Sequence, residues 1–324
     1  MFLSFLLLFA GFVILIKGAD FLVTGASSIA KKFNISNLAI GLTIVAFGTS
    51  TPELVVSFLS AIEGRNDAAF GNILGSNNFN MLFILGVSGL IYPLVVQRNT
   101  ITWEIPFSLL ASLMLYLMVN DQILFGQEKD MLSRVESILL LLLFGLFLIY
   151  VHRSMKRNVE YNETLSIKIY ATPFATGMIL LGFVMLIGGG SLVVDNAVAI
   201  AEYYGLSQRL IGLTILAAGT SLPELATSAV AAYRKNTDIA IGNVIGSNIF
   251  NICFILGLTS VVTPIPYNNV MNFDFEVMTA STLLLMIFMF TFNQRKLDRW
   301  ESFILLASYI GYIFFLVVQD PGST

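Results

Sequence analysis

Residues 41–54 read GLTIVAFGTSTPEL and residues 212–225 read GLTILAAGTSLPEL, with 11 of 14 positions identical. A second pair follows at the same offset of 171 residues: GNILGSNNFNMLFILG at 71–86 and GNVIGSNIFNICFILG at 242–257, with 11 of 16 positions identical. Because one offset serves both pairs, the similarity indicates a duplication. Any fold of this chain has to contain the same pattern twice.

The composition is typical of a membrane protein. Hydrophobic residues make up 56 % of the 324 residues, charged residues make up 11 %, and the mean hydropathy is +0.84. An ordinary soluble domain is about 25 % charged, because its exterior has to face water. We therefore expect an all-α polytopic membrane protein, which excludes most soluble enzymes. The net charge of −3 gives no indication of a nucleic-acid partner.

Ten apolar stretches approach the roughly 20 residues that a membrane span requires. They lie near 2–28, 38–61, 70–93, 103–119, 134–151, 171–200, 208–232, 240–263, 276–292 and 300–318. The first and the sixth exceed the thickness of a bilayer, so we expect these two helices to be tilted or bent.

The offset of 171 residues crosses five of these spans, which is an odd number. Equivalent helices therefore run through the membrane in opposite directions. The sequence predicts two inverted-topology repeats of five helices each, at 1–151 and 171–324, joined by a connecting loop at 152–170. Many secondary transporters have this architecture, with the substrate site near the midplane between the repeats.

The Lys and Arg residues of the loops predict the orientation, because cytoplasmic loops are enriched in them. The loops that follow odd-numbered spans carry twelve of these residues and the opposite face carries four. The four are Arg65, Lys129, Arg134 and Arg209. This imbalance predicts that both termini are extracellular and that the basic loop 152–170 is cytoplasmic.

Two carboxylates fall inside the repeated segments, near the middle of the second and seventh spans. A carboxylate at the centre of a membrane helix costs about 2.5–3.5 kcal/mol. Only Lys17, in the first stretch, is a candidate basic partner for Glu53 and Glu224. The equivalent positions of the two glutamates predict a polar cavity or a bound cation.

The spacing of polar residues places more oxygen atoms beside each glutamate. Thr49 and Ser50 precede Glu53 by four and three residues, which is one face of a helix. Pro52 lacks an N–H group and its ring clashes with the carbonyl four residues earlier, so we expect a broken helix there. The second repeat has the same arrangement, formed by Thr220, Ser221, Pro223 and Glu224.

Polar residues also recur every fourth position on the third and eighth spans. The two stripes are Asn72, Ser76 and Asn80, and Asn243, Ser247 and Asn251. The predicted centre is therefore rich in oxygen and has no Cys or His cluster, which makes zinc and copper poor fits. Calcium takes 6–8 oxygen ligands, and two carboxylates neutralise its charge.

The motif G-T-S-x-P-E followed by G-N-x-x-G-S-N, present twice, resembles the repeats of the cation/Ca²⁺ antiporter superfamily, specifically the Na⁺/Ca²⁺ exchanger family. The resemblance covers essentially the whole membrane unit. It implies a secondary-active antiporter that exchanges Na⁺ for Ca²⁺ by alternating access. The proton-coupled branch usually carries a G-N-x-x-E type motif instead, so the resemblance favours sodium.

The resemblance also implies roles for individual residues. Glu53 and Glu224 correspond to ligands shared by Ca²⁺ and Na⁺, and Asn80 to a central amide. Asn251, its counterpart, departs from many exchangers, which have Asp there; this argues against K⁺ dependence. The implied hydroxyl ligands of Na⁺ are Ser50, Ser76, Ser221 and Ser247. The positions that match backbone-carbonyl ligands are Thr49, Thr220, Ala46 and Ala217.

Other functions stay open at this point. The nearest alternative is H⁺/Ca²⁺ exchange, in which the two glutamates titrate instead of binding sodium. An ion channel is a more distant alternative, and no hydrolase motif lies in the expected spans. We expect no enzyme activity, no cofactor beyond the transported Ca²⁺ and Na⁺, and a bilayer, most simply a prokaryotic plasma membrane, as the surroundings. A monomer suffices for transport, and the oligomeric state is undetermined.

Overall fold

The computed structural model describes residues 2–120, 130–155, 168–204, 217–291 and 293–319. Within these residues, eight helices are long and apolar enough to cross a membrane. A further pair, Asn37–Thr49 and Thr51–Ile62, passes the same test as one span bent by 47°. The chain is therefore a helical, polytopic membrane protein, as its composition predicts. Residues 208–216 of the expected seventh span lie outside the described residues.

The helices follow the expected stretches closely, and several contain short π-helical segments. The first half has α1 (Phe2–Phe33), α2 (Asn37–Ile40), η1 (Gly41–Val45), α3 (Ala46–Thr49), α4 (Thr51–Ile62), α5 (Asn66–Asn78), η2 (Phe79–Ile84), α6 (Leu85–Ile91), η3 (Thr100–Glu104), α7 (Ile105–Val119) and α9 (Arg134–Ser154). The second half has α10 (Thr172–Tyr203), α12 (Ala217–Gly219), α13 (Leu222–Tyr233), α14 (Thr237–Ile249), η5 (Phe250–Leu256), α15 (Gly257–Val262), the 3₁₀ turn η6 (Asn269–Met271), α16 (Asn272–Phe288) and α17 (Arg299–Gln319).

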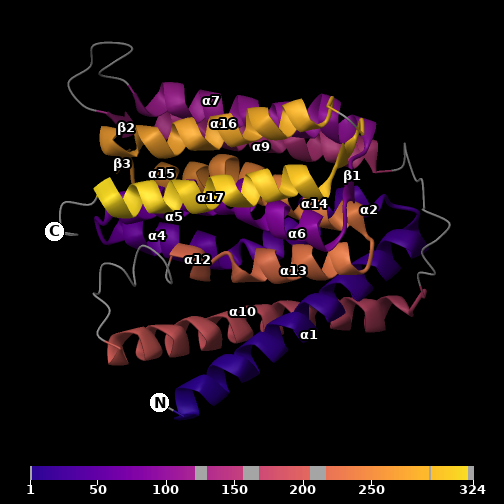
Figure 1. The fold of residues 1–324 in the computed structure, drawn as a ribbon. Helices are drawn as coiled ribbons and strands as arrows, with labels where there is room; N and C mark the ends of the chain where they lie inside the picture. The colour runs from indigo at the N-terminus through magenta and orange to yellow at the C-terminus, as the bar shows by residue number, and fades with distance from the viewer. Residues whose placement is uncertain (1, 121–129, 156–167, 205–216, 292, 320–324) are drawn as a thin grey trace.

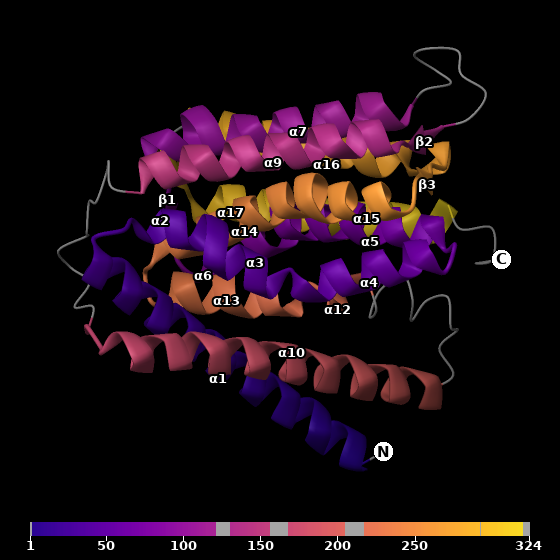
Figure 2. The same cartoon turned by 180° about the vertical axis from the view of Figure 1, so that it is seen from behind.

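The helices are arranged in layers (Figures 1 and 2). One layer holds α7, α9 and α16, and a middle layer holds α5, α14, α15 and α17. Helices α4, α12 and α13 lie on the other side of the middle layer, and α1 and α10 cover them. The spans Asn66–Ile91 and Thr237–Val262 are 78 % and 94 % buried, while the outer spans are 22–39 % buried. The two segments with the polar stripes are thus the core, and the outer helices present apolar side chains outward.

Helices α1 and α10 are the two long helices that the sequence predicts. Each has 32 residues, which at 1.5 Å per residue is about 48 Å, against a hydrocarbon core of about 30 Å. They cross each other obliquely (Figure 1). This confirms that the first and sixth stretches are too long to cross the bilayer upright.

Glycines form the contact between α1 and α10. A Cβ atom on Gly11 would lie 3.1 Å from the Gly189 carbonyl oxygen, and one on Gly18 would lie 3.0 Å from that of Gly182. A Cβ atom on Gly25 would lie 2.7 Å from the Ala175 carbonyl oxygen. As the residue number rises on α1 it falls on α10, so the two helices pack antiparallel. Small residues let membrane helices approach this closely.

Two short antiparallel ladders outside the spans join the halves. β1 (Leu94–Val95) pairs with β4 (Lys296–Leu297), and β2 (Met131–Leu132) pairs with β3 (Ile265–Pro266). The sequence analysis does not predict these strands, because two residues carry no periodicity. The connecting loop expected at 152–170 is described only at 152–155 and 168–170, and its remainder lies outside the described residues.

The glycine contact predicts a specific loss of stability. In Gly182→Ala the new methyl group would lie 2.8 Å from the Leu22 backbone nitrogen and 2.9 Å from the Gly18 carbonyl oxygen. Because backbone cannot rotate away, we expect a destabilisation of about 1–3 kcal/mol, measured by thermal unfolding in detergent. Gly177→Ala is the matched control on the same helix, since its Cβ would meet nothing within 4 Å. Equal melting temperatures for the two variants would contradict the close packing.

Candidate cation site

Both repeated motifs break a helix at a serine, as the proline in each motif predicts. α3 ends at Thr49, Ser50 has φ −83° and ψ 10°, and α4 begins at the next residue. Ser221 has nearly the same conformation, with φ −89° and ψ 9°, between α12 and α13. Since proline is tolerated in the first turn of a helix, each motif ends one helix and starts another within the membrane.

The new helices place a glutamate in their first turn. Glu53 is in the first turn of α4 and Glu224 in the first turn of α13. Unpaired backbone N–H groups give a helix N-terminus a partial positive charge, which stabilises an acidic side chain there. The two glutamates are 0 % and 1 % exposed. The broken helix thus provides part of the stabilisation that a buried carboxylate needs.

Serines from one half bind the glutamate of the other half. The Ser50 hydroxyl donates to Glu224 Oε1 at 2.8 Å, and the Ser221 hydroxyl donates to Glu53 Oε1 at 2.8 Å. Longer contacts come from the same half, from Ser76 to Glu53 at 3.4 Å and from Ser247 to Glu224 at 3.5 Å. The structure therefore brings all six of these predicted residues together at one centre.

The threonines of the motifs also bond across the halves. Thr49 Oγ1 donates to Asn243 Oδ1 at 3.0 Å, and Thr220 Oγ1 donates to Asn72 Oδ1 at 3.2 Å. Each asparagine amide in turn donates to the backbone carbonyl of the glutamate in its own half, at 3.3 Å. These bonds fix the break in each helix against the core helix of the opposite half.

The backbone ligands that the resemblance implies are less clearly placed. The Ala46 carbonyl accepts from the Ser50 N–H at 3.0 Å and from the Thr49 hydroxyl at 3.3 Å. Ala217 begins α12, directly after residues that lie outside the described part. The role of Thr49, Thr220, Ala46 and Ala217 as carbonyl ligands stays a prediction.

Asn80 and Asn251 occupy the π-helical segments η2 and η5, a type of segment often found at functional sites. Asn80 Nδ2 donates to Asn248 Oδ1 at 3.0 Å, and Asn251 Nδ2 donates to Asn77 Oδ1 at 2.9 Å. The sequence analysis does not include Asn77 and Asn248 among the site residues. Their signal was present, because both belong to the repeated G-S-N segment at the same offset.

Four oxygens at this centre are buried and have no hydrogen-bond partner within the described residues. They are Glu53 Oε2, Glu224 Oε2, Asn80 Oδ1 and Asn251 Oδ1. Buried polar groups are almost always paired, and burying one alone is costly. All four are acceptors, since the amide nitrogens of both asparagines already donate elsewhere. Acceptors without donors are the complement of a cation.

The chemistry of the donor set also limits which cation fits. No group of three or more His, Cys, Asp or Glu side chains is placed to hold a metal ion in the described ranges. The centre therefore combines two carboxylates with neutral hydroxyl and amide oxygens. Hard cations such as Ca²⁺ prefer oxygen ligands of this kind.

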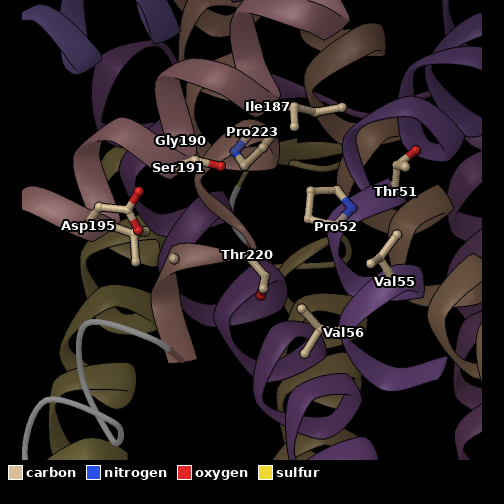
Figure 3. A pocket seen from close by; sticks show the side chains of 12 residues that line it. Thr51, Pro52, Val55, Val56, Ile187, Gly190, Ser191, Asp195, Thr220 and Pro223 are labelled. Atoms are coloured by element: carbon tan, nitrogen blue, oxygen red, sulfur yellow. The ribbon is translucent and has the colours of Figure 1, made fainter. Parts of the chain in front are cut away.

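A pocket of about 390 Å³ leads to the centre between α4 and α10 (Figure 3). We call it the α4–α10 pocket. Its walls include Pro52 and Pro223, the residues immediately before the two glutamates, and Thr220. Farther along it, Val56 comes from α4 and Asp195 from α10. The pocket thus extends from the level of the broken helices toward the ends of α4 and α10.

A helical membrane fold with broken helices around a buried carboxylate pair is the arrangement of an ion transporter. The family model described as sodium/calcium exchanger protein matches residues 3–152 and 174–318. The chain belongs to this family.

Individual relatives cover nearly the whole chain. A putative antiporter CaxA from Alkalimonas amylolytica is 42 % identical over 94 % of this chain and 96 % of its own length. The sodium/calcium exchanger MaX1 from Methanosarcina acetivorans is 31 % identical over 97 % and 98 %. A solved structure of the sodium-calcium exchanger NCX_Mj, soaked with Na⁺ and Sr²⁺, has a TM-score of 0.82 and 32 % identity over 97 % of this chain and 98 % of that one.

The site predicts which glutamates a bound cation requires. We expect Glu53→Gln and Glu224→Gln each to weaken Ca²⁺ binding at least tenfold, or about 1.4 kcal/mol, because each removes one of two charges. The measurement is the rise of the melting temperature with Ca²⁺ concentration, since a ligand stabilises the folded state that binds it.

Glu104→Gln is the matched control for this measurement. Glu104 is also buried in a span, at 2 % exposed, and it accepts a hydrogen bond from Tyr150 at 2.7 Å. It should keep the full Ca²⁺ response. An unchanged response in either central variant would remove the glutamates from the site.

Proposed function

We propose that this protein is a secondary-active antiporter that exchanges Na⁺ for Ca²⁺. The observation that carries the proposal is the cluster of four buried, unpartnered oxygens on Glu53, Glu224, Asn80 and Asn251. Two of the four residues are carboxylates, whose charge balances one Ca²⁺. Family membership supports the same assignment, because relatives over nearly the full chain are named as exchangers of these two ions.

The serine hydroxyls provide a reason why sodium and calcium compete. Ser50 and Ser221 donate to the Oε1 atoms of the glutamates, while their lone pairs stay available as acceptors. We infer that Na⁺ ions bind between a glutamate and the neighbouring hydroxyls, and that Ca²⁺ binds between the two glutamates. Since both ions then need the same carboxylates, filling the site with one expels the other. The proposed ligand set is Glu53, Glu224, Ser50, Ser76, Ser221, Ser247, Asn80 and Asn251, with Thr49, Thr220, Ala46 and Ala217 as backbone donors of oxygen.

We further propose ten spans in two inverted repeats, at 1–151 and 171–324. Two observations support this topology beside the sequence repeat. The antiparallel crossing of α1 and α10 is what equivalent helices of inverted repeats would show. The family model also matches in two separate segments, one in each half. All proposed ligands come from one chain, so a monomer suffices for transport.

The orientation is part of the same proposal. α1 begins and α17 ends at the same end of the bundle (Figure 1), and the Lys and Arg count predicts that this end is extracellular. The α4–α10 pocket extends from the centre toward that end, as the direction of α10 in Figure 1 indicates. The conformation described is thus outward-facing, in a plasma membrane of prokaryotic type. No resident cofactor and no covalent catalysis are needed for this exchange.

The proposal predicts the coupling ion. An outward Na⁺ gradient across proteoliposomes should drive ⁴⁵Ca²⁺ uptake with no K⁺ present, because the site has two carboxylates and Asn251 in place of a third. The Glu224→Gln protein should take up no more than vesicles without protein. Gradients of H⁺, K⁺ and Li⁺ imposed separately are the remaining arms. Uptake that follows a pH gradient and ignores Na⁺ would assign the protein to H⁺/Ca²⁺ exchange.

A further inference from the structure

The two long helices meet their neighbours in different ways. α1 packs against the end of α13, where the Arg234 guanidinium donates to the Asp20 carboxylate and to the Thr24 hydroxyl. α10, in contrast, is separated from α4 by the α4–α10 pocket. One face of the molecule is therefore closed by an ion pair, and the equivalent face is open.

The offset of 171 residues relates the two faces. It places Thr24 of α1 at Asp195 of α10, and it places Arg234 at position 63, two residues before Arg65. Each half thus has an acidic residue on its long helix. Each half also has an arginine just after the broken helix that faces the long helix of the other half.

The small mismatches agree in direction. The second half has its acidic residue at 195, whereas the exact equivalent of Asp20 is position 191, one helical turn earlier. Arg65 is the third residue after α4 ends at Ile62, whereas Arg234 directly follows α13. Both residues of the second pair are therefore shifted toward the end of their helices, so they keep the same relative depth.

The groups of the second pair are not joined in the described conformation. Arg65 pairs with Glu63, two residues away, on an exposed loop. Asp195 lines the pocket and has no ion-pair partner within the described ranges. A charge on the wall of a pocket, without a partner, is available for a contact in another conformation.

We propose that Asp20, Thr24 and Arg234 form a latch that holds the α1–α13 face closed, and that Asp195 and Arg65 form the corresponding latch when the α10–α4 face closes. The inference rests on the proposed alternating access. It assigns four charged positioning residues outside the ion centre. Each latch stabilises one of the two conformations and is broken in the other.

The exposure of the formed latch suits this role. The Arg234 and Asp20 side chains are 37 % and 39 % exposed, so water competes for both, and such pairs contribute little stability. A ligand or a contact shifts a two-state equilibrium only by its difference between the states. We therefore expect each latch to change the ratio of the two conformations by about two- to fivefold, which favours one state without trapping it.

The test measures the accessibility of the α4–α10 pocket. Val56→Cys places a thiol on its wall, in a Cys253→Ala background that removes the native cysteine, which is buried. Purified protein in detergent is reacted with a water-soluble maleimide. Asp20→Asn breaks the formed latch and should slow labelling about two- to fivefold. Asp195→Asn and Arg65→Gln break the other latch and should accelerate it by a similar factor.

Two controls keep the test decisive. Asp298→Asn breaks the Lys296–Asp298 ion pair elsewhere, at 2.9 Å, and should leave labelling unchanged. Asp20→Arg combined with Arg234→Asp restores the pair with reversed charges and should restore the labelling rate, which separates a latch from a merely unfolded variant. Unchanged or slowed labelling in Asp195→Asn, or unchanged or accelerated labelling in Asp20→Asn, would overturn the proposal.

Cross-linking tests the unformed pair directly. In the same background, Arg65→Cys with Asp195→Cys should form a disulfide under oxidation, block access of the maleimide to the pocket and release it on reduction. A pair that never cross-links, or that cross-links with the pocket still open, would refute the second latch. Neither measurement depends on which ions are exchanged, so its failure is distinct from a failure of the Na⁺/Ca²⁺ assignment.

Discussion

Two buried carboxylates without a basic partner are the constraint on which the structure depends. A charge in the membrane interior is tolerated only when oriented dipoles, hydrogen-bond donors or a counter-ion surround it. Here the first turns of α4 and α13 provide the dipoles, and Ser221 and Ser50 provide the donors at 2.8 Å. The broken helices, which would be a defect in an ordinary span, exist because each new helix start stabilises a glutamate.

The same constraint explains why the halves depend on each other. Neither glutamate obtains its nearest hydroxyl from its own half, and Thr49 and Thr220 likewise bond to asparagines of the opposite half. The two segments that carry these asparagines are the most buried spans described. The centre is consequently rigid, whereas α1 and α10 contact it through smaller surfaces and through each other. Such a division allows the outer pair to change position while the ion ligands keep their geometry.

Much of the fold follows from hydropathy and from the repeat. The long first and sixth helices, the break before Pro52 and the burial of the polar stripes all agree with the expectations. The features that the sequence analysis misses are short or depend on neighbours. The two-residue ladders have no periodicity, and the glycines of α1 and α10 are indistinguishable from ordinary packing glycines until the partner helix is known. Asn77 and Asn248 lie one residue after the serines Ser76 and Ser247, so one-face reasoning assigns them elsewhere.

The sequence by itself determined the kind of protein: apolar stretches set the number and length of helices, and residues repeated at one offset set the chemistry of the centre. These are properties of separate segments, so they can be read along the chain. Only the tertiary structure decided that each serine bonds to the glutamate of the other half, and that four particular oxygens are left without a partner. It also decided which face is closed by Arg234 and which is open. Two nearly equal repeats are compatible with either face closed, and the choice depends on how α1 and α10 pack against the helices that the repeat places beside them.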